Sequence, residues 1–130
     1  MATGLPATTG DILTAATVNG LVAFQSTITD KTVDYTLVLA DAYQVLISLQ
    51  KATAIALKIP TNATAALPVG SVITVLNKGA GTCTISAVTS GTTTVLSAGA
   101  TAASPTLGQY KSCALIKTAT DIWYVVGAIA

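Results

Sequence analysis

From Val33 onward, the sequence falls into short runs of strand-forming residues separated by residues that favour turns. The runs are rich in Thr, Val and Ile and include VDYTLVL, TAIALKI, SVITVLN, TCTISAV and QYKSCALIKT. Turn signals at intervals of about ten residues are typical of an all-β sandwich or barrel. We therefore predict an all-β fold, a small antiparallel β-sandwich or barrel of about eight short strands. In the GAG turn at 79–81, Gly79 and Gly81 are expected to supply positive φ angles.

Residues 1–30 lack this pattern, and we assign them to an N-terminal arm ahead of a β domain at 31–130. Residues 1–10 (MATGLPATTG) are small and show no period, so they are expected to be extended. Further along, Leu13, Val18, Leu21 and Val22 recur at helical spacing, which predicts one short helix. A helix this short is marginal in water by itself. We expect these four residues, together with Phe24, to contact a partner surface.

The last strand-like run, IWYVVGAI, is apolar on both of its faces. Alternation along a strand places Trp123 and Val125 on one face and Ile122, Tyr124 and Val126 on the other. Trp123, the chain's one tryptophan, is the predicted anchor of the core. The second face then needs a cover of its own. We expect Ile122, Tyr124 and Val126 to lie at an interface with another subunit or under the N-terminal arm.

Charged residues make up 8% of the chain, against roughly a quarter in an average soluble domain. A surface with so little charge favours obligate assembly over a free monomer. The lysines are scattered singly and there is no Arg, so we expect no nucleic-acid partner. No apolar run reaches the length of about 20 residues that a membrane span needs. The N-terminus lacks the features of a secretory signal, so synthesis in a cytoplasm is expected.

The sequence offers little material for catalysis or for metal binding. There is no His and no Glu, which excludes histidine-based triads and histidine-ligated metals. Asp41 and Asp121 stand where Asp commonly forms turns. Cys83 and Cys113 are interpreted as two buried reduced thiols, with a cross-strand disulfide as the alternative. We expect no enzyme activity, no catalytic residue, no cofactor and no metal.

Several motifs occur in an order that resembles a β domain found in virion proteins of tailed bacteriophages. They are LTAATVN in the N-terminal segment, ADA at 40–42, IP at 59–60, PVG at 68–70, GAG at 79–81 and the closing pattern of Thr120, Trp123 and Gly127. The resemblance spans residues 11–130. TSGTTTVLSAG departs from it, because this region carries more charge in the family.

The resemblance implies a bacteriophage structural protein located on the capsid surface of the virion. The preferred role is a capsid decoration or cement protein that binds the major capsid protein as a homo-oligomer, expected to be a homotrimer, and stabilises the shell. The alternative role is a tail-fibre or receptor-binding tip that recognises the host. A short arm ahead of the β domain favours decoration, because a fibre carries a long shaft. A soluble carbohydrate-binding module is a third hypothesis, and the scattered aromatic residues argue against it.

Overall fold

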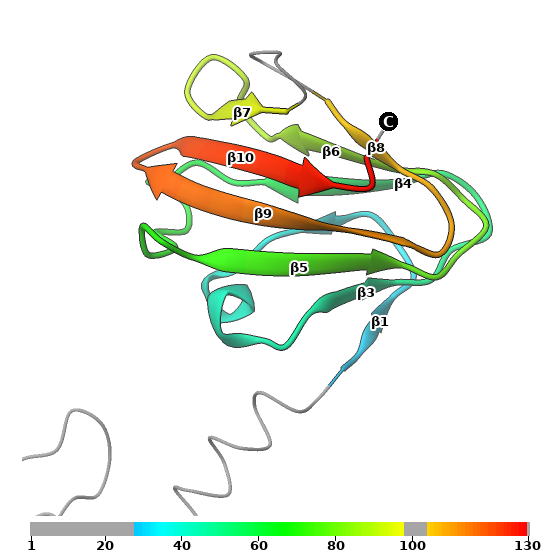
Figure 1. Cartoon of the computed structure of the whole chain (residues 1–130). Helices are drawn as coiled ribbons and strands as arrows, with labels where there is room; N and C mark the ends of the chain where they lie inside the picture. The colour runs from blue at the N-terminus through cyan, green and yellow to red at the C-terminus, as the bar shows by residue number, and fades with distance from the viewer. Residues whose placement is uncertain (1–27, 98–103, 130) are drawn as a thin grey trace, which may run out of the picture.

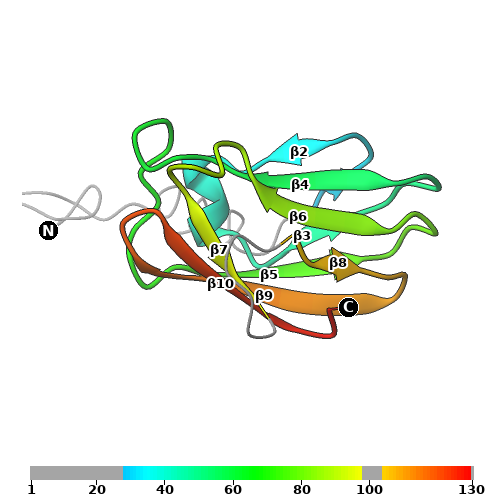
Figure 2. The same cartoon turned by 90° about the horizontal axis from the view of Figure 1, so that it is seen from above.

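The computed structural model describes residues 28–97 and 104–129, which form two β-sheets lying face to face (Figure 1, Figure 2). The six-stranded sheet has the order β1-β3-β5-β9-β10-β7, and the four-stranded sheet has the order β2-β4-β6-β8. The elements are β1 (Asp30–Lys31), β2 (Tyr35–Thr36), the 3-10 helix η1 (Leu39–Tyr43), β3 (Ile47–Leu49), β4 (Ile55–Ile59), β5 (Val72–Asn77), β6 (Cys83–Ala87), β7 (Thr94–Leu96), β8 (Thr106–Leu107), β9 (Lys111–Ala119) and β10 (Ile122–Gly127).

The prediction of a largely β fold is confirmed for the described residues, whereas the prediction of antiparallel sheets is wrong. Five of the eight strand pairs are parallel. From β1 to β6 the chain enters the two sheets in alternation, so each strand pairs with the strand two places along. A strand that returns to its own sheet after one full coil keeps its direction, and the pairs are therefore parallel. The β9–β10 hairpin then pairs antiparallel with β5.

The strand predicted for VDYTLVL is shorter than expected, because its second half turns into η1. Strand β2 ends at Thr36, and η1 begins at Leu39. The carboxylate of Asp41 accepts the backbone N–H of Val38 at 2.8 Å, which satisfies a donor at the start of the helix. The described residues contain ten strands, one 3-10 helix and no α-helix. The predicted short helix and residues 1–27 of the predicted arm (1–30) lie outside the described residues, and the last residue of that arm, Asp30, belongs to β1.

Glycines in the turn at 78–81 allow successive coils to stack closely, and this corrects their predicted role. The φ angles of Gly79 and Gly81 are not positive. A Cβ on Gly81 would lie 1.7 Å from the carbonyl oxygen of Thr53, and one on Gly79 would lie 2.2 Å from that of Lys51. The N–H of Gly81 donates to the Lys51 carbonyl at 3.0 Å. Close backbone approach between two turns is what requires glycine here.

The core lies between the two sheets and receives alternate side chains from each. Strand β4 shows the period clearly, since Ile55, Leu57 and Ile59 are buried while the residues between them are half-buried. From the other sheet, Leu115 and Trp123 point into the same core. Trp123 is 1% exposed, so the face of β10 that carries it is the inner face.

Candidate functional site

The outer face of the six-stranded sheet carries a row of large apolar side chains that nothing in the described chain covers. Three register pairs create the row. Val72 lies opposite Ile116, Ile116 lies opposite Tyr124, and Tyr124 lies opposite Leu96. Figure 1 shows β5, β9 and β10 side by side in front of the other sheet. Val72 is 57% exposed and Tyr124 is 42% exposed, so the row is open to solvent in the single chain.

A second row runs beside the first and contains small or apolar residues. Thr74 lies opposite Ala114, and Ala114 lies opposite Val126, which is 48% exposed. We call the two rows together the outer apolar face. The alternate residues on this side of β5, β9 and β10 include no charged side chain. They are Val72, Thr74, Leu76, Ser112, Ala114, Ile116, Thr118, Ile122, Tyr124 and Val126.

The structure places the four residues predicted on β10 on opposite sides of the sheet. Trp123 lies in the core, and its ring centroid is 5.9 Å from the Nζ of Lys117. Tyr124 and Val126 lie on the outer apolar face, and Ile122 is half-buried opposite Thr94 of β7. Sequence reasoning missed Ile116 as a member of the same face, although its alternation within KSCALIKT was a usable signal. The other predicted contact residues (Leu13, Val18, Leu21, Val22 and Phe24) lie outside the described residues.

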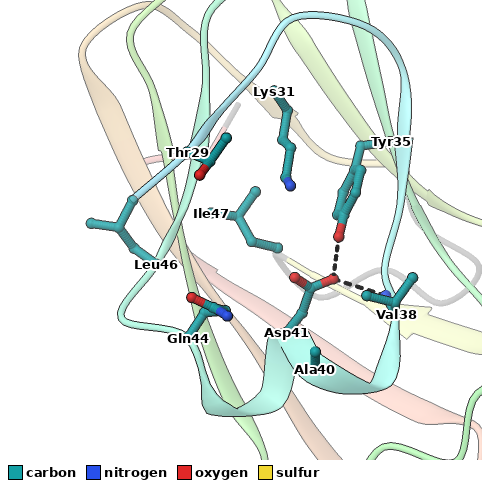
Figure 3. Close-up of a pocket in the computed structure, with 9 residues that line it drawn as sticks. All are labelled: Thr29, Lys31, Tyr35, Val38, Ala40, Asp41, Gln44, Leu46 and Ile47. Atoms are coloured by element: carbon teal, nitrogen blue, oxygen red, sulfur yellow. Dashed lines mark hydrogen bonds between the residues drawn. The ribbon is translucent and has the colours of Figure 1, made fainter. Parts of the chain in front are cut away.

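A shallow hollow of about 230 Å³ opens beside η1 (Figure 3). Three of the residues that line it contact one another. The hydroxyl of Tyr35 donates to Oδ2 of Asp41 at 2.7 Å, and the Nζ of Lys31 lies 4.4 Å from the Tyr35 ring centroid. Burial raises the pKa of Tyr35, and its bond to the Asp41 carboxylate raises it further. Tyr35 therefore stays protonated near neutral pH and serves as a hydrogen-bond donor that holds η1 against β2.

The two cysteines lie in the core as free thiols rather than as a disulfide. Burial raises the pKa of Cys83 to about 11 and that of Cys113 to about 12. A thiol must lose its proton to act as a nucleophile or a metal ligand, so both are chemically quiet near neutral pH. Among residues 28–97 and 104–129, no group of three or more His, Cys, Asp or Glu side chains is placed to hold a metal. In the same residues, no helix is long and apolar enough to cross a membrane.

Comparisons of this chain with protein-family models, with curated proteins and with solved structures find no match. The functional argument therefore rests on the residues themselves and on where the fold places them.

Proposed function

We propose that this chain is a bacteriophage structural protein of the capsid-decoration type, and that its copies meet through the outer apolar face. The observation that carries this proposal is the exposure of Val72, Tyr124 and Val126 on the part of the sheet formed by β5, β9 and β10, where no outward side chain is charged. A monomer rarely leaves a continuous apolar surface in water, and such a surface usually marks an interface. The order of the sequence motifs supplies the virion context.

A second copy of the chain is the occupant that fits this surface best. In a symmetric assembly the same patch can occur on both sides of a contact, so a charged patch would face charges of its own sign. The outer apolar face avoids this repulsion because the outward side chains of β5, β9 and β10 carry no charge. The low charge of the whole chain, at 8%, points the same way. Tyr124 lies near the middle of the first row and is the type of residue that most often dominates binding energy at an interface.

Binding to isolated phage heads tests the proposal. The experiment compares heads that lack this protein with purified wild-type chain, with Val126→Asp and with Val88→Asp. Val88 is a matched control because it is 54% exposed, follows β6 of the four-stranded sheet and bonds the Ile59 carbonyl of β4 through its backbone N–H. We expect wild type and Val88→Asp to saturate the heads and Val126→Asp to bind at least tenfold more weakly, a difference of about 1.4 kcal/mol. Absence of binding to heads, together with labelling of tails, would overturn the decoration role and favour the host-recognition tip.

The N-terminal arm is the second part of the same proposal. Its apolar residues at helical spacing are proposed to contact the capsid or a neighbouring subunit. Deleting residues 2–28 should leave the β domain folded, as judged by its circular dichroism spectrum, but unable to bind heads. Full occupancy by the shortened chain would show that the arm is not needed.

A further inference from the structure

Lys117 of β9 is buried in a way that a lysine rarely is. It is 2% exposed, and its Nζ lies 2.6 Å from Oδ1 of Asn62 and 2.6 Å from the carbonyl oxygen of Leu67. The ion pairs of the described residues join Lys51 to Asp34 and Lys78 to Asp30, so no described carboxylate lies within ion-pair distance of Lys117. Burying an ammonium group without a counter-charge is costly. Packing alone therefore does not explain why a lysine is buried at this position.

The asparagine that meets this amine is itself held in place from the other side. Oδ1 of Asp121 accepts the backbone N–H of Asn62 at 2.7 Å and the hydroxyl of Thr93 at 3.0 Å. Asp121 occupies the β9–β10 turn with a φ of 56°, a conformation that Asp tolerates better than most residues. The loop that carries Asn62 is thus fixed against the hairpin that carries Lys117. Asn62 thus connects the two groups: its side-chain oxygen accepts from the Lys117 amine, and its backbone N–H donates to the Asp121 carboxylate.

We propose that Lys117 and Asn62 join in an intramolecular isopeptide bond. The ammonium group of Lys117 first gives up a proton; its Nζ then attacks the side-chain carbonyl carbon of Asn62, a new C–N bond forms, and the bond to the asparagine amide nitrogen breaks. That nitrogen leaves as ammonia and takes up the protons that lysine releases, so an ammonium side chain and an amide become a new amide and one ammonium ion. No oxidant, reductant or other reactant is needed. Asp121 is a positioning residue that holds Asn62 for the attack.

Two features of the site favour this reaction over a permanent hydrogen bond. Fixing both partners within one fold raises their effective concentration, which for well-oriented groups reaches about 10⁵–10⁸ M. The product also suits the surroundings better than the reactants do. It removes the buried positive charge, and its remaining N–H can donate to the Leu67 carbonyl that already lies 2.6 Å from Nζ.

The bond would link two parts of the fold that are distant in sequence. Asn62 follows β4 and Lys117 lies 55 residues further on, in β9. The link ties the four-stranded sheet to the β9–β10 hairpin of the six-stranded sheet. A cross-link of this kind restricts the unfolded chain as a disulfide does. The isopeptide bond would give a covalent cross-link to a protein whose two cysteines form no disulfide.

Intact mass spectrometry of the denatured full chain tests the proposal. We expect the wild-type mass to be lower than the sequence mass by one ammonia, and digestion to yield one branched peptide containing both Lys117 and Asn62. Lys117→Arg should have its full sequence mass. Asn62→Asp keeps the reacting carbonyl and should lose one water instead of one ammonia. Asp121→Asn should fold with the wild-type circular dichroism spectrum but cross-link at least tenfold more slowly.

Two results would overturn the proposal. One is a folded wild-type chain that keeps its full sequence mass after prolonged incubation. The other is an equal loss of ammonia in Lys117→Arg, because asparagine can also lose ammonia by closing on its own backbone. The branched peptide and the water loss of Asn62→Asp distinguish the cross-link from that reaction.

Discussion

The outer faces of the two sheets are built from the same kind of short strands, yet they differ sharply in polarity. On the four-stranded sheet the outward residues are Thr36, Ala56, Lys58, Thr84, Ser86 and Thr106, and Nζ of Lys58 donates to Oγ of Ser86 at 2.8 Å. On β5, β9 and β10 of the six-stranded sheet the outward positions include Val72, Ile116, Tyr124 and Val126, with Thr74, Ser112 and Thr118 as the polar members. The outer face of the four-stranded sheet is mainly polar, whereas that of β5, β9 and β10 is mainly apolar. This difference is the basis of our proposal that copies of the chain meet through the six-stranded sheet.

The inner faces of the same two sheets, in contrast, are both largely apolar. Each sheet contributes aliphatic side chains and one free thiol, Cys83 from β6 and Cys113 from β9. A change on an inner face should therefore affect folding, and a change on an outer face should affect folding little. The predictions below test this distinction.

The largest effect on stability is expected from Trp123→Ala, which removes the largest side chain that β10 contributes to the core. Removing a fully buried tryptophan should lower the free energy of unfolding by about 3–5 kcal/mol. Its neighbour Tyr124 is the internal control, since Tyr124→Ala removes a side chain from the outer face. Urea denaturation of both variants measures the difference. A larger loss in Tyr124→Ala would mean that the two faces are reversed.

Tyr124→Asp should break assembly with little effect on folding. A charge in the middle of the outer apolar face would be buried without a partner in the oligomer, so the dissociation constant should rise at least tenfold, or about 1.4 kcal/mol. Thr84→Asp makes the equivalent change on the outer face of the four-stranded sheet and should leave the oligomer intact. Sedimentation of both variants reports the result. Equal weakening by the two changes would contradict the assignment of assembly to one sheet.

The two core thiols should make stability fall at alkaline pH. Burial raises their pKa values from 9.0 in the unfolded chain to about 11 and about 12 in the folded chain. The folded state therefore holds these protons more tightly, and stability declines as the pH rises above 9. At about pH 10 each thiol should cost about 1 kcal/mol. Denaturation at several pH values checks this, and Cys113→Ala should show a shallower decline than wild type. An identical decline would place its origin elsewhere.

The smallest effect is expected from Lys58→Ala on the polar outer face. Lys58 is half-buried and bonds Ser86 across two strands that are already joined by their backbones. The free energy of unfolding should change by about 0.5 kcal/mol, and the oligomer should be unaffected. Thermal denaturation and sedimentation measure both quantities. Loss of the oligomer in this variant would show that the polar face takes part in assembly.

Alternation along strands made part of this arrangement predictable from the sequence. A period of two predicted that Trp123 and Tyr124 lie on different faces of their strand, and that Val72 and Thr74 share a face. Alternation within KSCALIKT also assigns Ile116 to one side of its strand, but it does not show that Ile116 lies beside Val72 and Tyr124, because the order of strands depends on register between distant segments. Thr-rich strands specify register weakly.

The coil of parallel pairs was not predictable, because a turn signal does not reveal where the next strand goes. The GAG turn at 79–81 reads as a hairpin turn, but it leads from β5 in one sheet to β6 in the other. The approach of Lys117 to Asn62 was hidden for the same reason. Their contact exists only because the coil brings the loop after β4 to the end of β9. Asp121 was correctly expected in a turn, but its bond to Asn62 could not be foreseen.

The mass of the assembled wild-type protein tests the central claim most directly. Native mass spectrometry of the full chain at micromolar concentration should show an oligomer, with the trimer expected, because we propose that a second copy covers the outer apolar face. A clean monomer under the same conditions would contradict the account.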